Sequence, residues 1–454
     1  MRPNRSRREA RSPALLAGLC LCLLAVESPA FGQAVSPAVF ISNNGNLEGS
    51  VSSFTVNADG SLAFVMKFLT GQRANLNDPC PGCNAYEISL TPDGRYLATS
   101  HAASNDPMQQ VTVLEVAADA TLTPVGTFSV PSSPLDLQWI TNTLLAVVKS
   151  AFGGSNLVRV YHFDPQVPAL TLVDQTTTGD FTTFVAVHPS GSYLYTQDSL
   201  GAPFVVQAYA ISPAGGLTLI DTEFTTSTFP LELAITNDGT KLYAAGGISN
   251  GGNKVLGFHI AMNGTLTPMA GSPFTSPGAS PSNVFVSGDD AFLVVGHGTD
   301  ATARTFAINP VTGQLTFTGA TFDVGLQGTL GDVRIEGDLL FVTDNSTAVD
   351  GVTGVYSFTL NADGSLTQNG PLQDTTGIAP RSVATWVPGP FTGDLNCDGA
   401  VDTLDIGPFA LALTDPAQYR VDFPNCNLRL SDTNGDGNFD GLDVQPFVQL
   451  LMGG

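Results

Sequence analysis

The sequence predicts an all-β fold, a seven-bladed β-propeller whose first and last strands close the ring together. The first observation is a repeated hairpin, because Phe54–Leu62 returns as Phe358–Leu366 with an Asp-Gly turn between alternating apolar residues. The second is a period, since the turn glycines Gly239, Gly288 and Gly337 follow one another at intervals of 49 residues. The third is composition: 48 Gly, 30 Pro and only 13% charged residues favour short strands and tight turns over helices.

The chain begins with an expected secretory signal peptide at residues 1–33. Residues 2–11 carry five arginines, residues 13–26 form an apolar run too short to span a bilayer, and small residues follow at Ala30 and Gly32. We therefore expect a secreted, cell-surface or periplasmic protein without a transmembrane segment. The net charge of −23 argues against nucleic acid as a partner and favours divalent cations or a basic partner.

Four cysteines follow the signal peptide, in two separated groups. An even number in an oxidising compartment predicts two disulfides, Cys80–Cys83 and Cys397–Cys426. The Cys-Pro-Gly-Cys segment could instead be redox-active or half of a zinc site. It has no helical context and no second Cys-x-x-Cys, so we expect a loop staple.

Residues 34–388 form the predicted propeller. Six complete inner hairpins and seven outer hairpins alternate along this region, which leaves one blade incomplete. The count resolves if Ser382–Trp386 supplies the innermost strand of the last blade, while Val39–Ser42 and the hairpin Val51–Phe64 supply its other three strands. Such a closure would leave no inner sheet edge unpaired.

Residues at the start of each innermost strand should face the central channel and so form a ring. Aligned on the turns, this ring is Glu87, Asp136, Phe184, Glu232, Asn283, Asp332 and Ser382. The candidate catalytic residues are four of its carboxylates and two histidines from the neighbouring strand ends: Glu87, Asp136, Glu232, Asp332, His101 and His297. Lys149 and Arg381 are further candidate partners. Several carboxylates in one narrow space would raise one another's pKa values and favour a bound cation. The alternative is that these polar groups only cap strand starts and bind backbone groups or water.

Three segments resemble lactonase-type seven-bladed propellers and propellers of Tyr-Val-Thr-Asn repeats. They are Leu340–Asn345 (Leu-Phe-Val-Thr-Asp-Asn), Val39–Asn44 (Val-Phe-Ile-Ser-Asn-Asn) and Thr91–Leu97 (Thr-Pro-Asp-Gly-Arg-Tyr-Leu). The resemblance covers about residues 35–388 and implies either a 6-phosphogluconolactonase-like hydrolase acting on a lactone or a propeller without catalysis. Lactonase-type relatives usually carry Pro-Arg-His at a strand start, where this chain has Pro380-Arg381-Ser382.

A Pro/Gly-rich linker at residues 389–393 leads into a small acidic domain at residues 394–454. Two loops in it place oxygen-bearing side chains at positions 1, 3, 5, 9 and 12, with glycine at position 6. Such EF-hand-type loops predict two Ca²⁺ sites, each completed by one backbone carbonyl. The expected ligands are Asp394, Asn396, Asp398, Ala400, Asp402 and Asp405 in the first loop and Asp432, Asn434, Asp436, Asn438, Asp440 and Asp443 in the second.

Each loop runs into a similar exit segment, residues 405–413 and 443–451, that should form a helix. Paired loop-plus-helix units with aspartate at position 12 resemble type I dockerin modules. The resemblance implies a cohesin-like or cell-surface protein partner that contacts residues beside the loops, Thr403-Leu404 and Gly441-Leu442.

The sequence thus favours a secreted calcium-binding propeller that its dockerin-like tail retains in an extracellular assembly, with a small ligand in the propeller channel. The first alternative is a lactonase-type hydrolase, and the second is a non-catalytic scaffold propeller. An enzyme needs a base and an electrophile that converge in the channel, whereas a scaffold needs only an exposed face.

Overall fold

A computed structural model describes most of the chain between residues 37 and 452. The described residues are 37–101, 110–117, 119–130, 133–149, 156–199, 203–225, 228–247, 252–325, 330–345, 353–386, 393–396, 401–423, 426, 428–431, 433–434 and 439–452. The predicted signal peptide, Cys397 and five of the expected calcium ligands lie outside them. Those five ligands are Asp398, Ala400, Asp432, Asp436 and Asn438.

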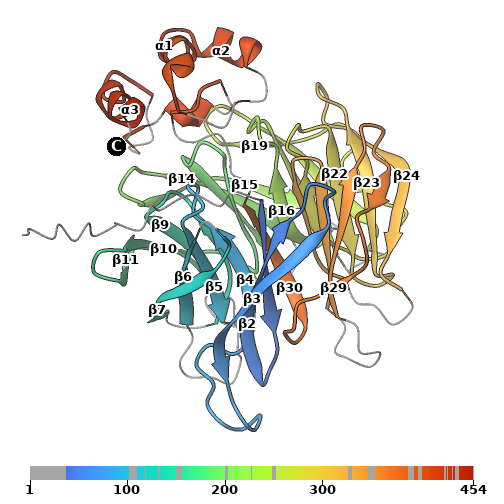
Figure 1. Cartoon of the computed structure of the whole chain (residues 1–454). Helices are drawn as coiled ribbons and strands as arrows, with labels where there is room; N and C mark the ends of the chain where they lie inside the picture. The colour runs from blue at the N-terminus through green and yellow to red at the C-terminus, as the bar shows by residue number, and fades with distance from the viewer. Residues whose placement is uncertain are drawn as a thin grey trace, which may run out of the picture.

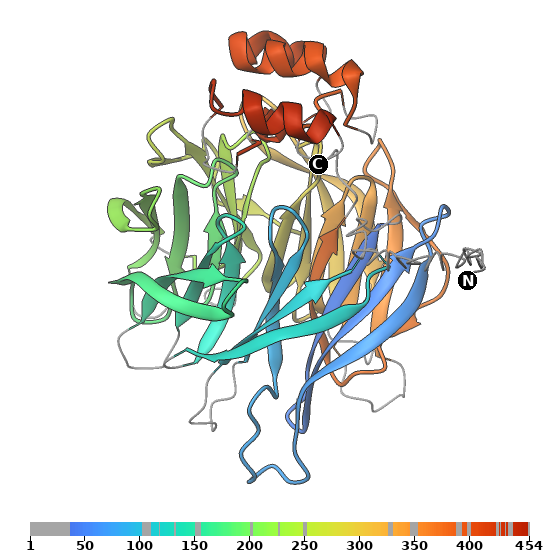
Figure 2. The same ribbon diagram turned by 60° about the vertical axis from the view of Figure 1, so that its left-hand side comes forward.

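Seven antiparallel sheets stand in chain order around a ring, which confirms the seven-bladed propeller (Figures 1 and 2). The innermost strands are β4 (Ala85–Leu90), β8 (Pro134–Trp139), β12 (Val185–Val187), β16 (Pro230–Ile235), β21 (Pro281–Val286), β25 (Leu330–Glu336) and β30 (Pro380–Trp386). The second strands are β5 (Tyr96–His101), β9 (Leu144–Lys149), β13 (Tyr193–Asp198), β17 (Lys241–Gly246), β22 (Phe292–His297), β26 (Leu339–Asp344) and β1 (Ala38–Asn44).

The third strands are β6 (Gln110–Val116), β10 (Leu157–Asp164), β14 (Phe204–Ile211), β18 (Lys254–Ile260), β23 (Thr302–Ile308), β27 (Gly354–Leu360) and β2 (Glu48–Val56). The outermost strands are β7 (Leu122–Ser129), β11 (Ala169–Thr177), β15 (Leu217–Thr225), β19 (Leu266–Pro268) with β20 (Phe274–Thr275), β24 (Leu315–Asp323), β28 (Leu366–Gln368) with β29 (Gln373–Asp374), and β3 (Leu62–Gln72).

The two ends of the propeller share one sheet, as the sequence predicts. Its strand order is β3-β2-β1-β30, and β1 pairs antiparallel with β30 from Ala38 opposite Trp386 to Ile41 opposite Val383. The last strand of the ring is therefore held by the first one, and the innermost edge is occupied in every blade. In Figure 1 the blue N-terminal strands lie beside the orange β30.

The repeated hairpin of the sequence joins the two outer strands of its blade. Gly60 and Gly364 take up φ angles of +78° and +80°, which a residue with a side chain rarely adopts. The aspartate before each glycine accepts a hydrogen bond from the second residue after it, at 3.0 Å from Ser61 N to Asp59 Oδ1. The Asn-Ala-Asp-Gly-Ser motif thus forms the turn of the hairpin.

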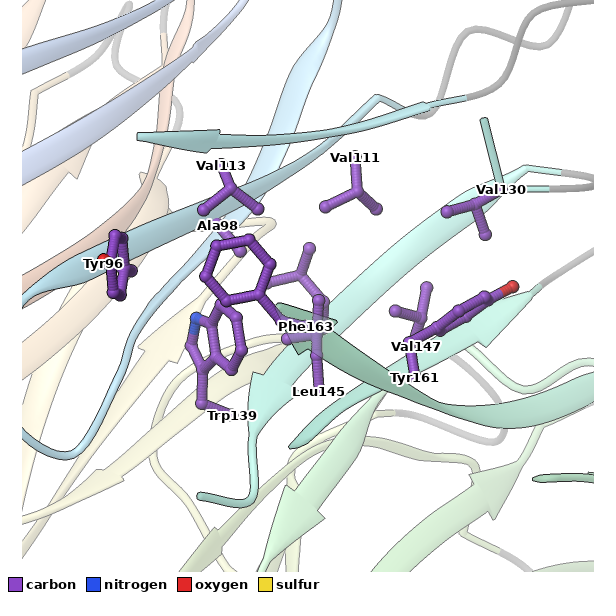
Figure 3. Packing of buried hydrophobic residues seen from close by; sticks show 11 residues of the cluster. Tyr96, Ala98, Val111, Val113, Val130, Trp139, Leu145, Val147, Tyr161 and Phe163 are labelled. Carbon is purple, nitrogen blue, oxygen red and sulfur yellow. The ribbon is translucent and has the colours of Figure 1, made fainter. Parts of the chain in front are cut away.

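The hydrophobic core lies between neighbouring blades. Figure 3 shows the core between the β4–β7 and β8–β11 blades, where Phe163 packs edge-on against Tyr96 and Trp139 with centroid separations of 5.2 and 5.6 Å. Trp139 also donates its Nε1–H to the carbonyl of Ser89 in the neighbouring blade, at 3.1 Å. Each blade is therefore stabilised chiefly by its neighbours, at roughly 25 cal/mol per Å² of apolar surface buried.

The C-terminal segment forms short helices around its own core. These are the 3-10 turns η1 (Thr403–Asp405) and η2 (Leu428–Ser431) and the helices α1 (Ile406–Thr414), α2 (Pro416–Asp422) and α3 (Val444–Leu451). The two predicted exit helices are α1 and α3, and α2 was not predicted. Phe409 of α1 stacks on Phe447 of α3 with centroids 3.9 Å apart, and Tyr419 of α2 is buried beside them. Among the described residues, no helix has the length and apolarity needed to cross a bilayer.

Candidate functional site

Six of the seven innermost strands carry a register shift near their first residues. The shift lies between Ala85 and Ile88 in β4, and equivalent shifts occur in β8, β16, β21, β25 and at β30. Four of these strands begin with proline, which lacks the N–H that a regular ladder would use. A bulge re-aims the side chains of its residues, and bulges are common beside functional sites. The four predicted carboxylates all lie at these shifts.

Both aspartates of the ring bind backbone N–H groups with both oxygens, and one of the two donors lies in the next blade. Asp136 accepts hydrogen bonds from the backbone N–H of Leu137 and from that of Val185 in β12, both at 2.7 Å. Asp332 accepts the corresponding pair from Val333 at 2.7 Å and from Val383 of β30 at 3.0 Å. Both oxygens of each aspartate are therefore engaged by the backbone. The two aspartates therefore fit the alternative interpretation of the sequence, in which the polar residues of the ring bind backbone groups at the strand starts.

The two glutamates are held less completely by the backbone. Glu232 accepts one hydrogen bond from the backbone N–H of Val284, at 3.2 Å. Glu87 forms an ion pair with Arg381 of β30, at 3.3 Å between Oε1 and Nε. The Arg381 guanidinium in turn lies 3.6 Å from the centre of the Tyr86 ring, a cation–π contact that fixes its plane. The predicted partnership of Arg381 with the carboxylate ring is confirmed.

The carboxylates of the ring interact through their charges as well. Burial raises the pKa of Glu232 well above its usual value, and the charges of Asp332, Glu87 and Asp136 add to the rise. Burial and the Glu87 charge do the same to the pKa of Asp136, and they raise that of Asp332 to about 7. The ring cannot carry all its negative charges at neutral pH.

Glu87 differs from the other three because a cation is beside it. Burial raises the pKa of Glu87, while the Arg381 charge and hydrogen bonds from Ser382 and Arg381 lower it. Among the four ring carboxylates, Glu87 is therefore the one whose ionised form is stabilised most by its neighbours. Glu232 has no such ion pair among the described residues and favours its protonated form.

A second arginine of the ring, Arg334, is not among the residues predicted from the strand starts. Arg334 lies two residues after Asp332, and its guanidinium stacks 4.2 Å from the centre of the Phe285 ring. Burial lowers the pKa of Arg334, and the charges of Glu336 and Asp332 oppose that change. Its place on an innermost strand, on the same face as a ring carboxylate, was the available signal.

The two candidate histidines have other partners. His101 lies with Nδ1 3.2 Å from the Cys83 carbonyl and Nε2 2.8 Å from the Thr112 hydroxyl. His297 repeats this pattern with the Thr302 carbonyl at 3.1 Å and the Ser276 hydroxyl at 2.7 Å. A carbonyl can only accept, so Nδ1–H donates in both, whereas a hydroxyl can donate to Nε2 or accept from it. Both imidazoles are buried, and burial lowers the pKa of His297.

The predicted Cys80–Cys83 disulfide is present. Both sulfur-bearing residues are buried, and the carbonyl of Gly82 between them accepts a hydrogen bond from the Thr70 hydroxyl at 2.6 Å. The bridge thus closes the loop before β4, and the hydrogen bond ties this loop to β3. Cys426 is also disulfide-bonded, and because Cys397 lies outside the described residues, their pairing stays a prediction.

The two acidic loops of the C-terminal segment share one hydrogen-bond pattern. Asp405 accepts the backbone N–H of Asn396 at 3.0 Å and that of Asp402 at 2.9 Å. Asp443 accepts those of Asn434 and Asp440 at 3.1 and 2.9 Å. Asp394, Asp405 and Asp443 are fully buried. The part of the loops that the structure describes contains no group of three or more acidic, histidine or cysteine side chains gathered as for a metal.

Comparison with known proteins agrees with the ring architecture. The family model for the lactonase seven-bladed β-propeller matches residues 142–246 and 217–330. The fold is a seven-bladed β-propeller, and the part of it at residues 142–330 is similar to the lactonase family. A periplasmic gluconolactonase from Pseudomonas aeruginosa is similar, with 18% identity, a TM-score of 0.60, and 77% of this chain and 99% of that chain covered.

A second similar structure is a candidate 6-phosphogluconolactonase from Bacteroides uniformis. Its identity is 16% and its TM-score 0.61, over 77% of this chain and 99% of that one. A protein from Lactobacillus plantarum is also similar, with 17% identity and a TM-score of 0.59. The match covers 78% of this chain and 99% of that chain. No curated protein matches the sequence of this chain. At these identities the likeness establishes the fold, and function has to be argued from the site.

Proposed function

We propose that the propeller is a lactone hydrolase whose site is the ring of Glu87, Glu232 and Arg381. The observation that carries the proposal is the Glu87–Arg381 ion pair within a ring of carboxylates whose pKa values are raised by burial. It supplies a base and an electrophile that lie side by side, as hydrolysis of a cyclic ester requires. The lactonase family model and the similar gluconolactonase fold support the same choice.

The reaction divides between the two glutamates. Ionised Glu87 takes a proton from a water molecule, whose oxygen attacks the lactone carbonyl carbon. The carbonyl oxygen gains the negative charge of the tetrahedral intermediate, and the Arg381 guanidinium stabilises it. The ring C–O bond then breaks, and protonated Glu232 gives its proton to the departing alkoxide. The proton on Glu87 then passes to Glu232 through solvent, so water is the only co-reactant and the product is a hydroxy acid.

The two aspartates act as positioning residues in this account. Each holds the N–H of a valine in the next blade, which fixes the bulged strands that carry the glutamates. The buried histidines are not used, since both of their ring nitrogens are already hydrogen-bonded. The absence of the Pro-Arg-His histidine therefore does not remove the base of the proposed reaction.

A panel of lactones tests the proposal directly. Purified protein is assayed for acid release from δ-valerolactone, glucono-δ-lactone and 6-phosphoglucono-δ-lactone, each with and without EDTA. Hydrolysis above the buffer rate that EDTA does not abolish is expected. A rate equal to that of buffer on all substrates would leave a binding or scaffold propeller as the better account.

We propose further that the C-terminal domain is a dockerin-like module that binds two Ca²⁺ ions. The favouring observation is that three aspartates, Asp394, Asp405 and Asp443, are fully buried, since ionised carboxylates need a compensating cation there. The described side chains that would hold the ions are Asp394, Asn396, Asp402 and Asp405 in one loop and Asn434, Asp440 and Asp443 in the other. Bound calcium would supply the neutralising charge.

The module would also carry the contact with a partner protein. Leu404 and Leu442 are 65% and 67% exposed at matching positions of the two loops, next to Thr403 and Gly441. Paired exposed leucines favour a protein partner, here one of the cohesin-like or cell-surface type. Retention of the enzyme in an extracellular assembly through this contact is part of the proposal.

A further inference from the structure

An apolar surface begins directly beside Glu232. Phe229 and Leu231 stand on either side of Pro230 at the start of β16, and Glu232 follows at once. Phe229 packs edge-on against Phe204, the first residue of β14 in the preceding blade, with centroids 5.5 Å apart. Phe204, Phe229 and Leu231 are all only half-buried. The three residues are called the aromatic strip below.

The packing of the strip is built into the backbone. Gly247 donates its N–H to the Phe229 carbonyl at 2.8 Å, so the end of β17 lies against the start of β16. A Cβ at Gly247 would come within 2.6 Å of Leu231 Cδ1 and 3.5 Å of Phe229 Cδ1. Glycine at this position therefore leaves the space that the two side chains fill. The strip is a fixed surface at the same end of the blades as the carboxylates.

The charged part of the ring lies in other blades. Glu87, Tyr86 and Arg381 come from β4 and β30, whereas the strip comes from β14 and β16, and the blades follow chain order around the ring. Arg381 lies against Glu87 and Tyr86, where the proposed reaction places the lactone carbonyl, and Arg334 lies against Phe285 near Asp332. The four ring carboxylates would repel a phosphate group.

We infer that the substrate is an uncharged lactone with an apolar substituent, which lies against Phe204, Phe229 and Leu231 while the lactone carbonyl faces Arg381. The inference rests on the proposed lactone hydrolysis and names the substrate class of that same site. In such a lactone, an alkyl chain on the carbon next to the oxygen of the lactone ring would run from the leaving alkoxide at Glu232 onto the strip. Burying such a chain supplies binding energy that a sugar hydroxyl could not obtain there.

Comparison of two lactones that differ only in their tail tests the inference. The full-length protein is assayed on δ-valerolactone, which has no substituent, and δ-decalactone, which carries a pentyl chain, and kcat/KM is measured for each. We expect kcat/KM to be at least about tenfold higher for δ-decalactone, because one methylene in an apolar pocket gives roughly tenfold or more. 6-Phosphoglucono-δ-lactone should be the poorest substrate.

The Phe229→Ser variant removes part of the strip and should lower kcat/KM for δ-decalactone about tenfold while leaving δ-valerolactone within about twofold. Phe224→Ser is the matched control, since Phe224 is 59% exposed on the outermost strand β15. Phe204→Ser provides a second test if Phe229→Ser unfolds, as judged by its melting temperature. Equal rates on the two lactones, or equal losses on both in the variant, would overturn the inference and leave the hydrolase proposal standing. Hydrolysis of neither would overturn both.

Discussion

The Asp332 carboxylate of β25 accepts a hydrogen bond from the backbone N–H of Val383 in β30, at 3.0 Å. Val383 belongs to the strand that closes the ring, so a side chain of the neighbouring blade helps to hold the closure. Asp136 makes the same contact to Val185, at 2.7 Å. Both oxygens of each aspartate thus accept backbone N–H groups, whereas Glu232 accepts only one, from Val284.

Replacing Asp332 with alanine should destabilise the propeller by about 2–3 kcal/mol. The change removes an acceptor from two buried backbone N–H groups, and unsatisfied buried groups of this kind cost about 1–3 kcal/mol each. Asp332→Asn keeps one acceptor and should cost less. Urea unfolding of both variants measures the difference. An Asp332→Ala variant as stable as the parent would show that the contact does not support closure.

Stability should fall as the pH rises from 5 to 8. The folded pKa of Asp332 is raised from 3.8 to about 7, so the folded state binds more protons than the unfolded state between these values. That shift corresponds to roughly 4 kcal/mol of stability, present at low pH and lost above the folded pKa. Melting temperatures at fixed calcium should be lower at pH 8 than at pH 5. Asp332→Asn should reduce the difference in melting temperature between pH 5 and pH 8. A difference as large as that of the parent would refute the raised pKa of Asp332 as its cause.

Calcium should bind the C-terminal domain with a stoichiometry of two. Removing the position-12 carboxylate by Asp405→Ala or Asp443→Ala should each abolish one site, because that residue is fully buried and organises its loop. Isothermal titration calorimetry on the full-length protein after EDTA treatment counts the ions. Asp422→Ala, at an exposed position at the end of α2, is the control and should retain both. Two ions bound by each loop variant would contradict the assignment.

Peptide mapping under non-reducing conditions should find Cys397 joined to Cys426. Cys426 is disulfide-bonded in the structure, and Cys20 and Cys22 lie in the predicted signal peptide. The bridge closes a loop of about thirty residues and should stabilise the domain by roughly 3–4 kcal/mol through the unfolded state. Free thiols at both positions, or Cys426 joined to a different cysteine, would disprove the pairing.

The architecture could be predicted because it is periodic. The recurring Asp-Gly turns gave the number of blades, and the missing hairpin gave the closure of β1 on β30. The same alignment gave the positions of Glu87 and Glu232, since each blade repeats one register. Arg381 followed from its place beside a ring residue.

What the sequence could not supply depends on contacts between blades. Nothing local marks Asp136 as bound to a valine 49 residues later, or Arg334 as stacked on Phe285. His101 looked available for catalysis, yet its partners are a carbonyl of the disulfide loop and a threonine on the third strand of its own blade. A histidine at a strand end has the same sequence pattern whether it acts in catalysis or in packing, so the sequence cannot tell the two roles apart.

The most direct test of the central claim is the rate of lactone hydrolysis by Glu87→Gln. Glutamine keeps the size of the side chain and an oxygen beside Arg381 but removes the base, so kcat should fall by about 10²-fold or more in protein that is still folded. Glu115→Gln is the matched control, because Glu115 pairs with Arg95 at a partly exposed site on β6. A Glu87→Gln enzyme that hydrolyses the lactone as fast as the parent and the control would contradict the account.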